Sequence, residues 1–268
     1  MGLLEIVDQT FRLYRANFWL FFSIAAVLHI PLGLLQAAAQ SFPIAIAAYI
    51  LILPGYLVVP AVMTKAVSDR YMGDPATIGA AYGYIGRRLL PLIGTIICAY
   101  LLIGAGLILL VVGTIIFALW ASFVTQVFVI EDKRYFNAIW RSKFLVGQGV
   151  WGEVIVLGLI TGILALLIQS PALALSFIAS GPGSSLWILQ GLIAGLAQAL
   201  ALPVGTVSVI LLYYDSRIRK EGFDLEMLAR ELGKQLPSVA PPQIMPPQAP
   251  APPQWPPAPP QSTGEGGV

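Results

Sequence analysis

Residues suited to hold an anion lie in a few short charged segments of this 268-residue chain. These segments place aromatic side chains next to basic ones, beside long apolar stretches. Such residues can hold anionic lipid headgroups at a membrane surface, at about 1 kcal/mol per basic residue. They can instead form ion pairs, with Asp215 or Glu221 bound to Arg87, Arg88 or Arg141, and both roles are open. The candidates are Arg87, Arg88, Arg141, Lys143, Tyr214, Asp215, Arg217, Arg219, Lys220 and Glu221.

Side chains suited to catalysis are scarce. His29 is the only histidine and Cys98 the only cysteine, and both lie inside apolar stretches. A histidine dyad or a histidine zinc site would have to use His29, but a lone histidine there is more often a hydrogen-bonded packing residue. The sequence contains no HExxH motif and no Gly-rich phosphate loop. We therefore expect a non-enzymatic protein without a cofactor or a metal site.

The charged residues leave three long stretches free of Asp, Glu, Lys and Arg: residues 16–64, 89–130 and 154–214. A charge inside a lipid bilayer costs several kcal/mol unless it is paired or hydrated. Hydrophobic residues make up 57% and charged residues 10% of the chain, against roughly 45–50% and about 25% in soluble domains. These features indicate an integral membrane protein, and the net charge of +2 gives no argument for nucleic acid.

The length of each charge-free stretch indicates two membrane spans. One span takes about 20 residues, whereas the shortest stretch holds 42. Two crossings per stretch also keep every basic cluster on one side, as the bias of basic residues for the cytoplasm favours. We predict an all-α integral membrane protein with six transmembrane helices arranged as three helical hairpins. The predicted spans are residues 18–39, 43–64, 90–108, 112–130, 154–174 and 186–213.

Amphipathic helices at the cytoplasmic interface are predicted before the hairpins. Residues 3–15 place apolar side chains at helical spacing opposite Glu5 and Asp8. Residues 77–88 and 134–147 are also expected to form short helices. Whether the three units of short helix and hairpin form a true repeat is open, as is the exact turn within the second hairpin, which lies in residues 104–113.

The last residues of the chain divide into two segments. Residues 224–236 form a further amphipathic helix, which completes a membrane domain over residues 1–236. Residues 237–268 are dense in proline and glutamine, a composition that cannot build a packed core. We predict a disordered tail on the cytoplasmic side.

Small residues four positions apart predict close contact between the fifth and sixth spans, because they let two helix backbones approach. Gly191 and Gly195 form another such pair in the outer half of the sixth span. From this pattern we expect Gly162→Leu to destabilise the fold more than Leu159→Ala. The helix-packing candidates are Gly158, Gly162, Ala201 and Gly205.

Glutamines inside the spans are the remaining polar side chains of interest. In lipid such residues usually form hydrogen bonds between helices, worth roughly 0.6–2 kcal/mol each. A cavity lined by these glutamines and His29 would favour a transporter, whereas a closely packed bundle with its charges paired at one end would favour a scaffold. The glutamines considered are Gln36, Gln126, Gln190 and Gln198.

Three segments resemble a bacterial membrane-protein family. They read LYYDSRIRKEGFDLEMLA (residues 212–229), IWRSKFLVGQG (139–149) and FRLYRANFWLF (11–21). Over residues 1–232 the chain resembles the glycerophosphoryl diester phosphodiesterase membrane-domain family. The resemblance implies a six-helix membrane fold of largely uncharacterised function. The phosphodiesterase catalytic domain to which some members are fused has no counterpart here, so the resemblance does not imply an enzyme.

We therefore predict a scaffold or accessory subunit for envelope or lipid processes in the bacterial inner membrane, with both termini in the cytoplasm. Its expected partners are the lipid bilayer, including anionic lipids, and a protein bound through the Pro-rich tail, where Trp255 offers an aromatic anchor. The alternative is a transporter of small molecules or lipids. A third hypothesis is a lipid-headgroup enzyme, which would need Glu153, Asp215 and Glu221 around a metal ion.

Overall fold

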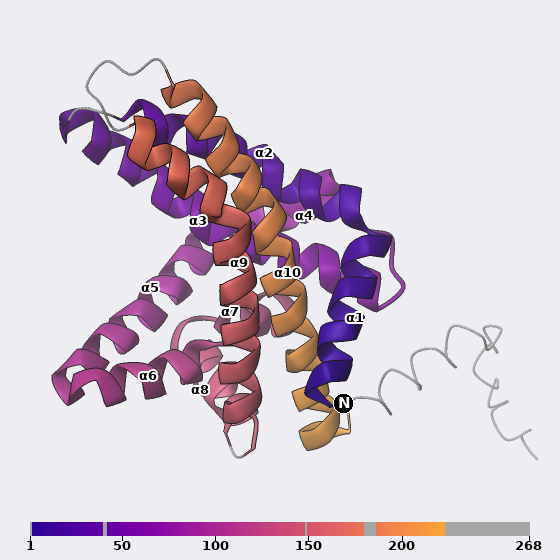
Figure 1. Ribbon diagram of the computed structural model, residues 1–268. Helices are drawn as coiled ribbons and strands as arrows, with labels where there is room; N and C mark the ends of the chain where they lie inside the picture. Colours follow the sequence, from indigo (N-terminus) through magenta and orange to yellow (C-terminus); the bar gives the residue numbers. More distant parts are fainter. Residues whose placement is uncertain (1, 40–41, 148, 180–185, 223–268) are drawn as a thin grey trace, which may run out of the picture. The chain divides into compact units, whose positions relative to one another are not determined.

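The structure is a computed structural model that describes residues 2–39, 42–147, 149–179 and 186–222. Within these ranges every regular element is a helix (Figure 1). The predicted amphipathic helix at 224–236 and the Pro-rich tail at 237–268 lie outside the described residues.

Short helices precede three groups of longer ones. The short helices are α1 (Leu3–Ala16), α4 (Ile78–Gly86) and α8 (Tyr135–Val146), close to the predicted 3–15, 77–88 and 134–147. The longer groups are α2 (Phe18–Ala38) with α3 (Phe42–Tyr71), then α5 (Leu89–Ala105), the 3-10 helix η1 (Gly106–Leu109), α6 (Leu110–Ala121) and α7 (Val124–Glu131), and finally α9 (Trp151–Ala179) with α10 (Trp187–Glu221).

Five of these helical segments are long and apolar enough to cross a membrane, which identifies a helical membrane protein. The helix pairs α2–α3, α5–α6 and α9–α10 are each in contact. Helix α3 would supply the sixth span but is not among the five segments, so the six-span hairpin arrangement stays a prediction. The five segments are Phe18–Ala38, Leu89–Leu109, Val111–Glu131, Trp151–Phe177 and Trp187–Glu221.

Tyrosine hydroxyls connect two of the short helices to the long ones. Tyr14 of α1 donates to the carbonyl oxygen of Leu200 in α10, at 3.3 Å. Tyr82 of α4 donates to the carbonyl oxygen of Ile24 in α2 at 2.7 Å, and Tyr84 donates to that of Val129 in α7 at 3.0 Å. The hydroxyls therefore fix the position of each short helix along its neighbour.

Helix α10 is the centre of the packing, because it contacts α1, α2, α3, α8 and α9. In an 18-residue stretch of α10, 61% is buried inside the protein, against 6% in α9. Most of the apolar surface of α9 is therefore left for lipid. Helix α10 ends at Gly222, whose φ of 63° is the left-handed conformation that commonly terminates helices.

The predicted small-residue contact between α9 and α10 is wrong. A Cβ atom built on Gly158, Gly162 or Gly205 would meet no atom within 4 Å, so these glycines lie against open space. Ala201 is buried, but the α9 glycines that were expected to face it are exposed. The spacing of small residues marks a helix face that permits close approach, and it does not identify the partner helix.

The close contact lies instead between α2 and α10. A Cβ on Gly195 would lie 2.7 Å from the carbonyl oxygen of His29 and 2.7 Å from Cα of Ile30. A Cβ on Gly33 would lie 2.5 Å from the carbonyl oxygen of Gly191. Real Cβ atoms do not approach backbone this closely, so this interface requires glycine.

The prolines within α2, α3 and α10 do not break these helices, which continue through Pro31, Pro54, Pro60 and Pro203. The interruption lies between α6 and α7, inside the predicted span 112–130. There the backbone N–H of Phe123 donates to Oγ of Ser142 in α8 at 3.0 Å. This bond satisfies a backbone group that the interrupted helix leaves free.

Candidate functional site

Charged side chains from four helices gather where α7 and α10 end and α9 begins, beside α8. Here the chain also leaves α7 through Asp132, in the left-handed conformation with φ 52°. We call this group the charged cluster. It consists of Glu131, Lys133, Arg141, Glu153, Tyr213, Asp215, Arg217, Arg219, Lys220 and Glu221.

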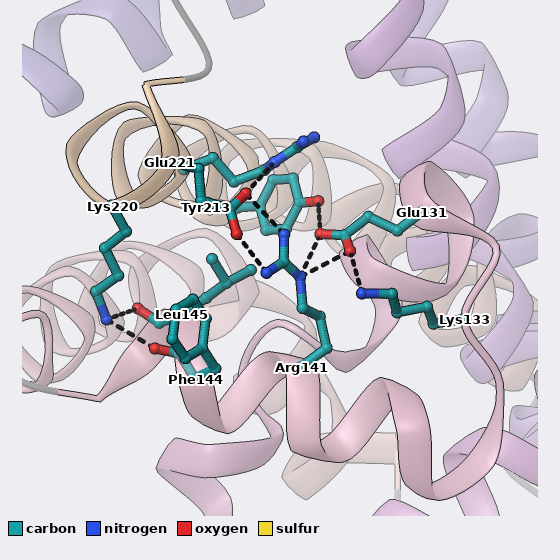
Figure 2. A network of polar contacts seen from close by, with 9 residues as sticks. Glu131, Lys133, Arg141, Phe144, Leu145, Tyr213, Lys220 and Glu221 are labelled. Atoms are coloured by element: carbon teal, nitrogen blue, oxygen red, sulfur yellow. Dashed lines mark hydrogen bonds and ion pairs between the residues drawn. The ribbon is translucent and has the colours of Figure 1, made fainter.

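Arg141 of α8 lies at the centre of the cluster, between two carboxylates (Figure 2). Its Nε atom is 2.7 and 3.0 Å from the two carboxylate oxygens of Glu131, the last residue of α7. Its Nη1 and Nη2 atoms donate to the two oxygens of Glu221 at the end of α10, the second at 2.7 Å. This two-pronged geometry is the strongest arrangement between arginine and a carboxylate. Arg141 therefore joins three helices.

The immediate surroundings of Arg141 are largely closed to water. The side chain of Glu131 is 10% exposed and that of Arg141 is 17% exposed. Hydrogen bonds to Glu221, and then to Glu131, hold the pKa of the Arg141 guanidinium above its usual range. Arg141 is therefore charged at every physiological pH, and its two carboxylate partners neutralise it.

Two adjacent tyrosines anchor α10 next to the cluster. The hydroxyl of Tyr213 donates to Glu131 at 2.8 Å, as drawn in Figure 2. Tyr214 shares a 2.6 Å hydrogen bond with Ser68 and stacks on Tyr71, with ring centroids 4.7 Å apart. Both side chains are buried. Tyr213 therefore joins α10 to the last residue of α7, and Tyr214 joins α10 to α3.

A second ion-pair group joins α10 to the start of α9. Arg219 lies 2.9 Å from a carboxylate oxygen of Glu153 and 2.5 Å from one of Asp215. Asp215 is 2% exposed, and this ion pair is a contact of its buried carboxylate. On the other side of α10, Arg217 pairs with Glu221 at 3.2 Å.

Lys220 of α10 is the cluster residue that contacts the last turn of α8. Its ammonium group donates to the carbonyl oxygens of Phe144, Leu145 and Gly147, at 2.7 and 2.8 Å for the first two. The last carbonyls of a helix have no partner within the helix and carry partial negative charge. Lys220 therefore caps α8 from α10 and supplies another contact between the two helices.

The ten predicted headgroup or ion-pair residues have different roles in the structure. Glu221 pairs with Arg141, one of the pairings left open above, whereas Asp215 pairs within its own helix. Arg88 contacts the hydroxyl of Tyr84 and lies 3.7 Å from Asp132, and neither residue belongs to the charged cluster as defined above. In the described ranges, Arg87 and Lys143 form no ion pair.

Sequence reasoning missed Glu131. It stands first in the run Glu131-Asp132-Lys133-Arg134, which has the composition of a solvated charged loop. Glu131 differs from the other three residues because it lies directly at the end of a charge-free stretch, where the helix still faces its neighbours. This position is the feature of the sequence that could have identified Glu131 as a cluster residue.

A surface cleft of about 670 Å³ lies next to the charged cluster. The Lys143 ammonium lies over the rings of Trp120 and Trp140, at 3.9 and 4.7 Å from their centroids. Of the two lysines in the cleft, Lys220 is bound to the carbonyl oxygens of α8, whereas Lys143 has only aromatic contacts among the described residues. The cleft is lined by Trp140, Lys143, Phe144, Gly147 and Lys220.

The polar residues predicted inside the spans lie at separate places in the structure. His29 is buried, and its Nδ1 atom lies 3.0 Å from the carbonyl oxygen of Ala25. Gln126 is also buried, with no partner for its Oε1 atom among the described residues. Across the part of the chain that the structure describes, no three His, Cys, Asp or Glu side chains are grouped to hold a metal ion.

We expect Tyr213→Phe to lower the free energy of unfolding by about 1.5–3 kcal/mol, because it removes a hydrogen bond to the ionised and mostly covered Glu131 carboxylate. Unfolding in detergent, followed by circular dichroism, measures this change. Tyr100→Phe is the matched control, since Tyr100 is 61% exposed. Equal stability of the two variants would contradict the role of the Tyr213 hydroxyl.

No protein-family model matches the sequence, and searches of curated proteins and of solved structures returned no match. The resemblance to the glycerophosphoryl diester phosphodiesterase membrane-domain family therefore stays a hypothesis that rests on the three segments quoted above.

Proposed function

We propose that the protein is a non-enzymatic scaffold or accessory subunit in envelope or lipid processes of the bacterial inner membrane. One observation carries this proposal: Arg141, in the middle of α8, holds the ends of α7 and α10 through two carboxylates. A transporter that alternates between two states has to separate helix ends at one face. Paired charges that hold three helices together favour a fixed arrangement, which suits a platform for other molecules.

The proposed topology has six spans in three hairpins, with the charged cluster and both termini in the cytoplasm. The bias of basic residues for the cytoplasmic side supports this orientation. The cluster brings together Lys133, Arg141, Arg217, Arg219 and Lys220 on one side of the apolar helices. In this topology the Pro-rich tail also lies in the cytoplasm.

Anionic lipids are the proposed ligands of the cleft beside the cluster. Ion pairs occupy Arg141, Arg217 and Arg219, and carbonyl groups occupy Lys220, so Lys143 is the cation left to contact a headgroup. Trp140 and Phe144 give the cleft aromatic walls, as is common where proteins meet the membrane interface.

We expect Lys143→Gln to weaken binding of phosphatidylglycerol several-fold, given that one basic residue near anionic lipid contributes about 1 kcal/mol. Native mass spectrometry of the detergent-solubilised protein with added phosphatidylglycerol measures the loss. Arg87→Gln is the control, because Arg87 is exposed and remote in sequence from the cleft. Equal weakening in both variants would indicate general surface charge and contradict a site at the cleft.

The scaffold proposal is tested by purifying the full chain in native lipid and comparing the proteins that accompany it with those of the Trp255→Ala variant. If the tail recruits a partner, one or more proteins are lost from the variant while the membrane domain remains folded. An unchanged set of proteins, or none in either sample, contradicts recruitment through the tail.

A transporter of small molecules or lipids is the second candidate. The observation that favours it is a cavity among the apolar helices with several glutamines in its wall. Its wall includes Gln36, Gln190 and Gln198 from the glutamines considered above, and neither Gln126 nor His29.

A further inference from the structure

A cavity of about 340 Å³ lies between α2, α3, α9 and α10, away from the charged cluster. Four glutamines line it: Gln36 from α2, Gln169 from α9, and Gln190 and Gln198 from α10. Ligand sites for small molecules commonly occupy roughly 300–1,000 Å³, so this space is large enough for a ligand.

The four amides have no hydrogen-bond partner in the part of the chain that the structure describes. Among the described residues, none of the four glutamine side chains forms a hydrogen bond with another residue. A polar group left without a hydrogen bond in an apolar medium costs about 1–3 kcal/mol by protein mutational measures. Gln169, Gln190 and Gln198 are half-buried and Gln36 is exposed on the protein surface, so in a membrane these amides would need polar atoms from a ligand or from water.

The rest of the wall restricts the chemistry of the ligand. Of the described residues that line the cavity, none is charged, so none of them can neutralise an ionised group. Between the amides, the wall is formed by small and apolar residues together with Ser176, whose hydroxyl donates to the carbonyl oxygen of Leu173. The small and apolar residues include Ala37, Ala172, Leu173 and Ala194.

The cavity lies beside the closest helix contact of the fold. Gly33 and Gly191 belong both to its wall and to the glycine interface between α2 and α10. Tyr56 of α3 also lines the cavity and packs edge-on against the buried His29 ring, with centroids 5.2 Å apart. These contacts hold the walls on α2, α3 and α10 in place, so the cavity belongs to the packed arrangement of the helices.

We propose that this cavity binds an uncharged amphiphile, with a hydroxyl- or amide-bearing headgroup on the glutamines and an apolar chain between the helices. A headgroup of this kind can donate to and accept from amide side chains without carrying a charge into the bilayer. The apolar residues between the glutamines accommodate the first carbons of the chain. The proposal requires that α2, α9 and α10 lie in the membrane, and it is independent of the scaffold function.

The test uses 1-monooleoylglycerol as the probe and the full chain in lipid nanodiscs. Its two hydroxyls match the predicted headgroup, and methyl oleate provides the same chain without them. Glycerol alone provides the headgroup without the chain. Binding is measured by native mass spectrometry, and equilibrium titration follows with the labelled probe.

We expect the wild-type protein to bind monooleoylglycerol in preference to methyl oleate and to glycerol. The double variant Gln169→Leu/Gln190→Leu should bind it at least about tenfold more weakly, because two amide hydrogen bonds to the headgroup are lost. The control is Gln126→Leu, which removes a glutamine of α7 that does not line the cavity. This control should bind as the wild type does.

Each other outcome overturns the proposal in a defined way. Equal binding of monooleoylglycerol and methyl oleate shows that the glutamines do not recognise a headgroup. Equal binding of glycerol and monooleoylglycerol identifies a site for a small polyol and not for an amphiphile. Unchanged binding in the double variant, with its thermal unfolding also unchanged, places the ligand elsewhere.

Discussion

Replacing Arg141 with methionine is expected to lower the free energy of unfolding by about 3–5 kcal/mol, because the change leaves a buried carboxylate without its counter-ion. Glu131 is the residue most affected, since its side chain is 10% exposed and lies at the end of an apolar helix. Lys133, 3.0 Å away and 43% exposed, remains as a partner but compensates weakly. Glu221 at the end of α10 loses its two-pronged contact as well.

The measurement is unfolding of the purified protein in mixed micelles by titration with SDS. The matched control is Lys143→Gln, two positions along the same helix, which removes a cation that has only aromatic contacts. We expect this control to change stability by less than about 0.5 kcal/mol. A similar loss in both variants would show that any cation on α8 suffices.

A compensating change separates the effect of charge from the effect of packing. Adding Glu131→Gln to Arg141→Met removes the uncompensated carboxylate, so we expect the double variant to be more stable than Arg141→Met alone. Additive destabilisation by the two changes would contradict a direct interaction between Arg141 and Glu131.

Gly195→Leu is expected to have the second large effect, because α2 and α10 approach too closely for any side chain at this position. Its Cβ atom would lie 2.7 Å from the backbone of His29 and Ile30, which cannot rotate away as a side chain can. Inserting atoms into a packed interior typically costs about 1–3 kcal/mol, and a branched side chain between two backbones exceeds that range. The same unfolding assay in micelles reports the loss.

Gly162→Leu is the control for this prediction. Its Cβ atom meets nothing within 4 Å, so we expect stability close to that of the wild type. This reverses the expectation drawn from the spacing of small residues alone. A larger loss for Gly162→Leu than for Gly195→Leu would support the predicted small-residue contact between α9 and α10 and contradict the packing described above.

The positions of the helices followed closely from the sequence. Lipid excludes unpaired charges so strongly that the charge-free stretches mark where long helices lie, and the charged segments mark their ends. The short helices could also be predicted from the sequence, since α1 has one buried face and one exposed face. Ile6 and Thr10 are buried there, whereas Arg12 and Arg15 are exposed.

The partners of these helices could not be predicted. Gly158 and Gly191 cannot be distinguished in the sequence. The spacing of small residues indicates which face of a helix is small, but it does not indicate which helix packs against that face. The same limit applies to the charged cluster. Glu221 was predicted as a candidate partner of Arg141. Glu131 is identified as a partner only by the structure, in which α7 ends beside α8.

The glutamine cavity shows a further limit of sequence reasoning. Gln36, Gln190 and Gln198 were recognised as polar residues inside spans, but Gln169 was overlooked and Gln126 was grouped with them. To tell which glutamines line the cavity, one must know how four helices are rotated relative to one another. That rotation depends on packing between residues far apart in the sequence.

The claim that Arg141 holds the helix ends in one arrangement is tested most directly by measuring distances between spin labels on α8 and α10. The labels replace exposed Asn137 and Leu196, with Cys98 changed to alanine, and the protein is studied in lipid nanodiscs by pulsed electron paramagnetic resonance. We predict one narrow distance population in the otherwise wild-type protein and a broader distribution in Arg141→Met. Two populations in the former, or an unchanged distribution in the variant, would contradict a fixed arrangement.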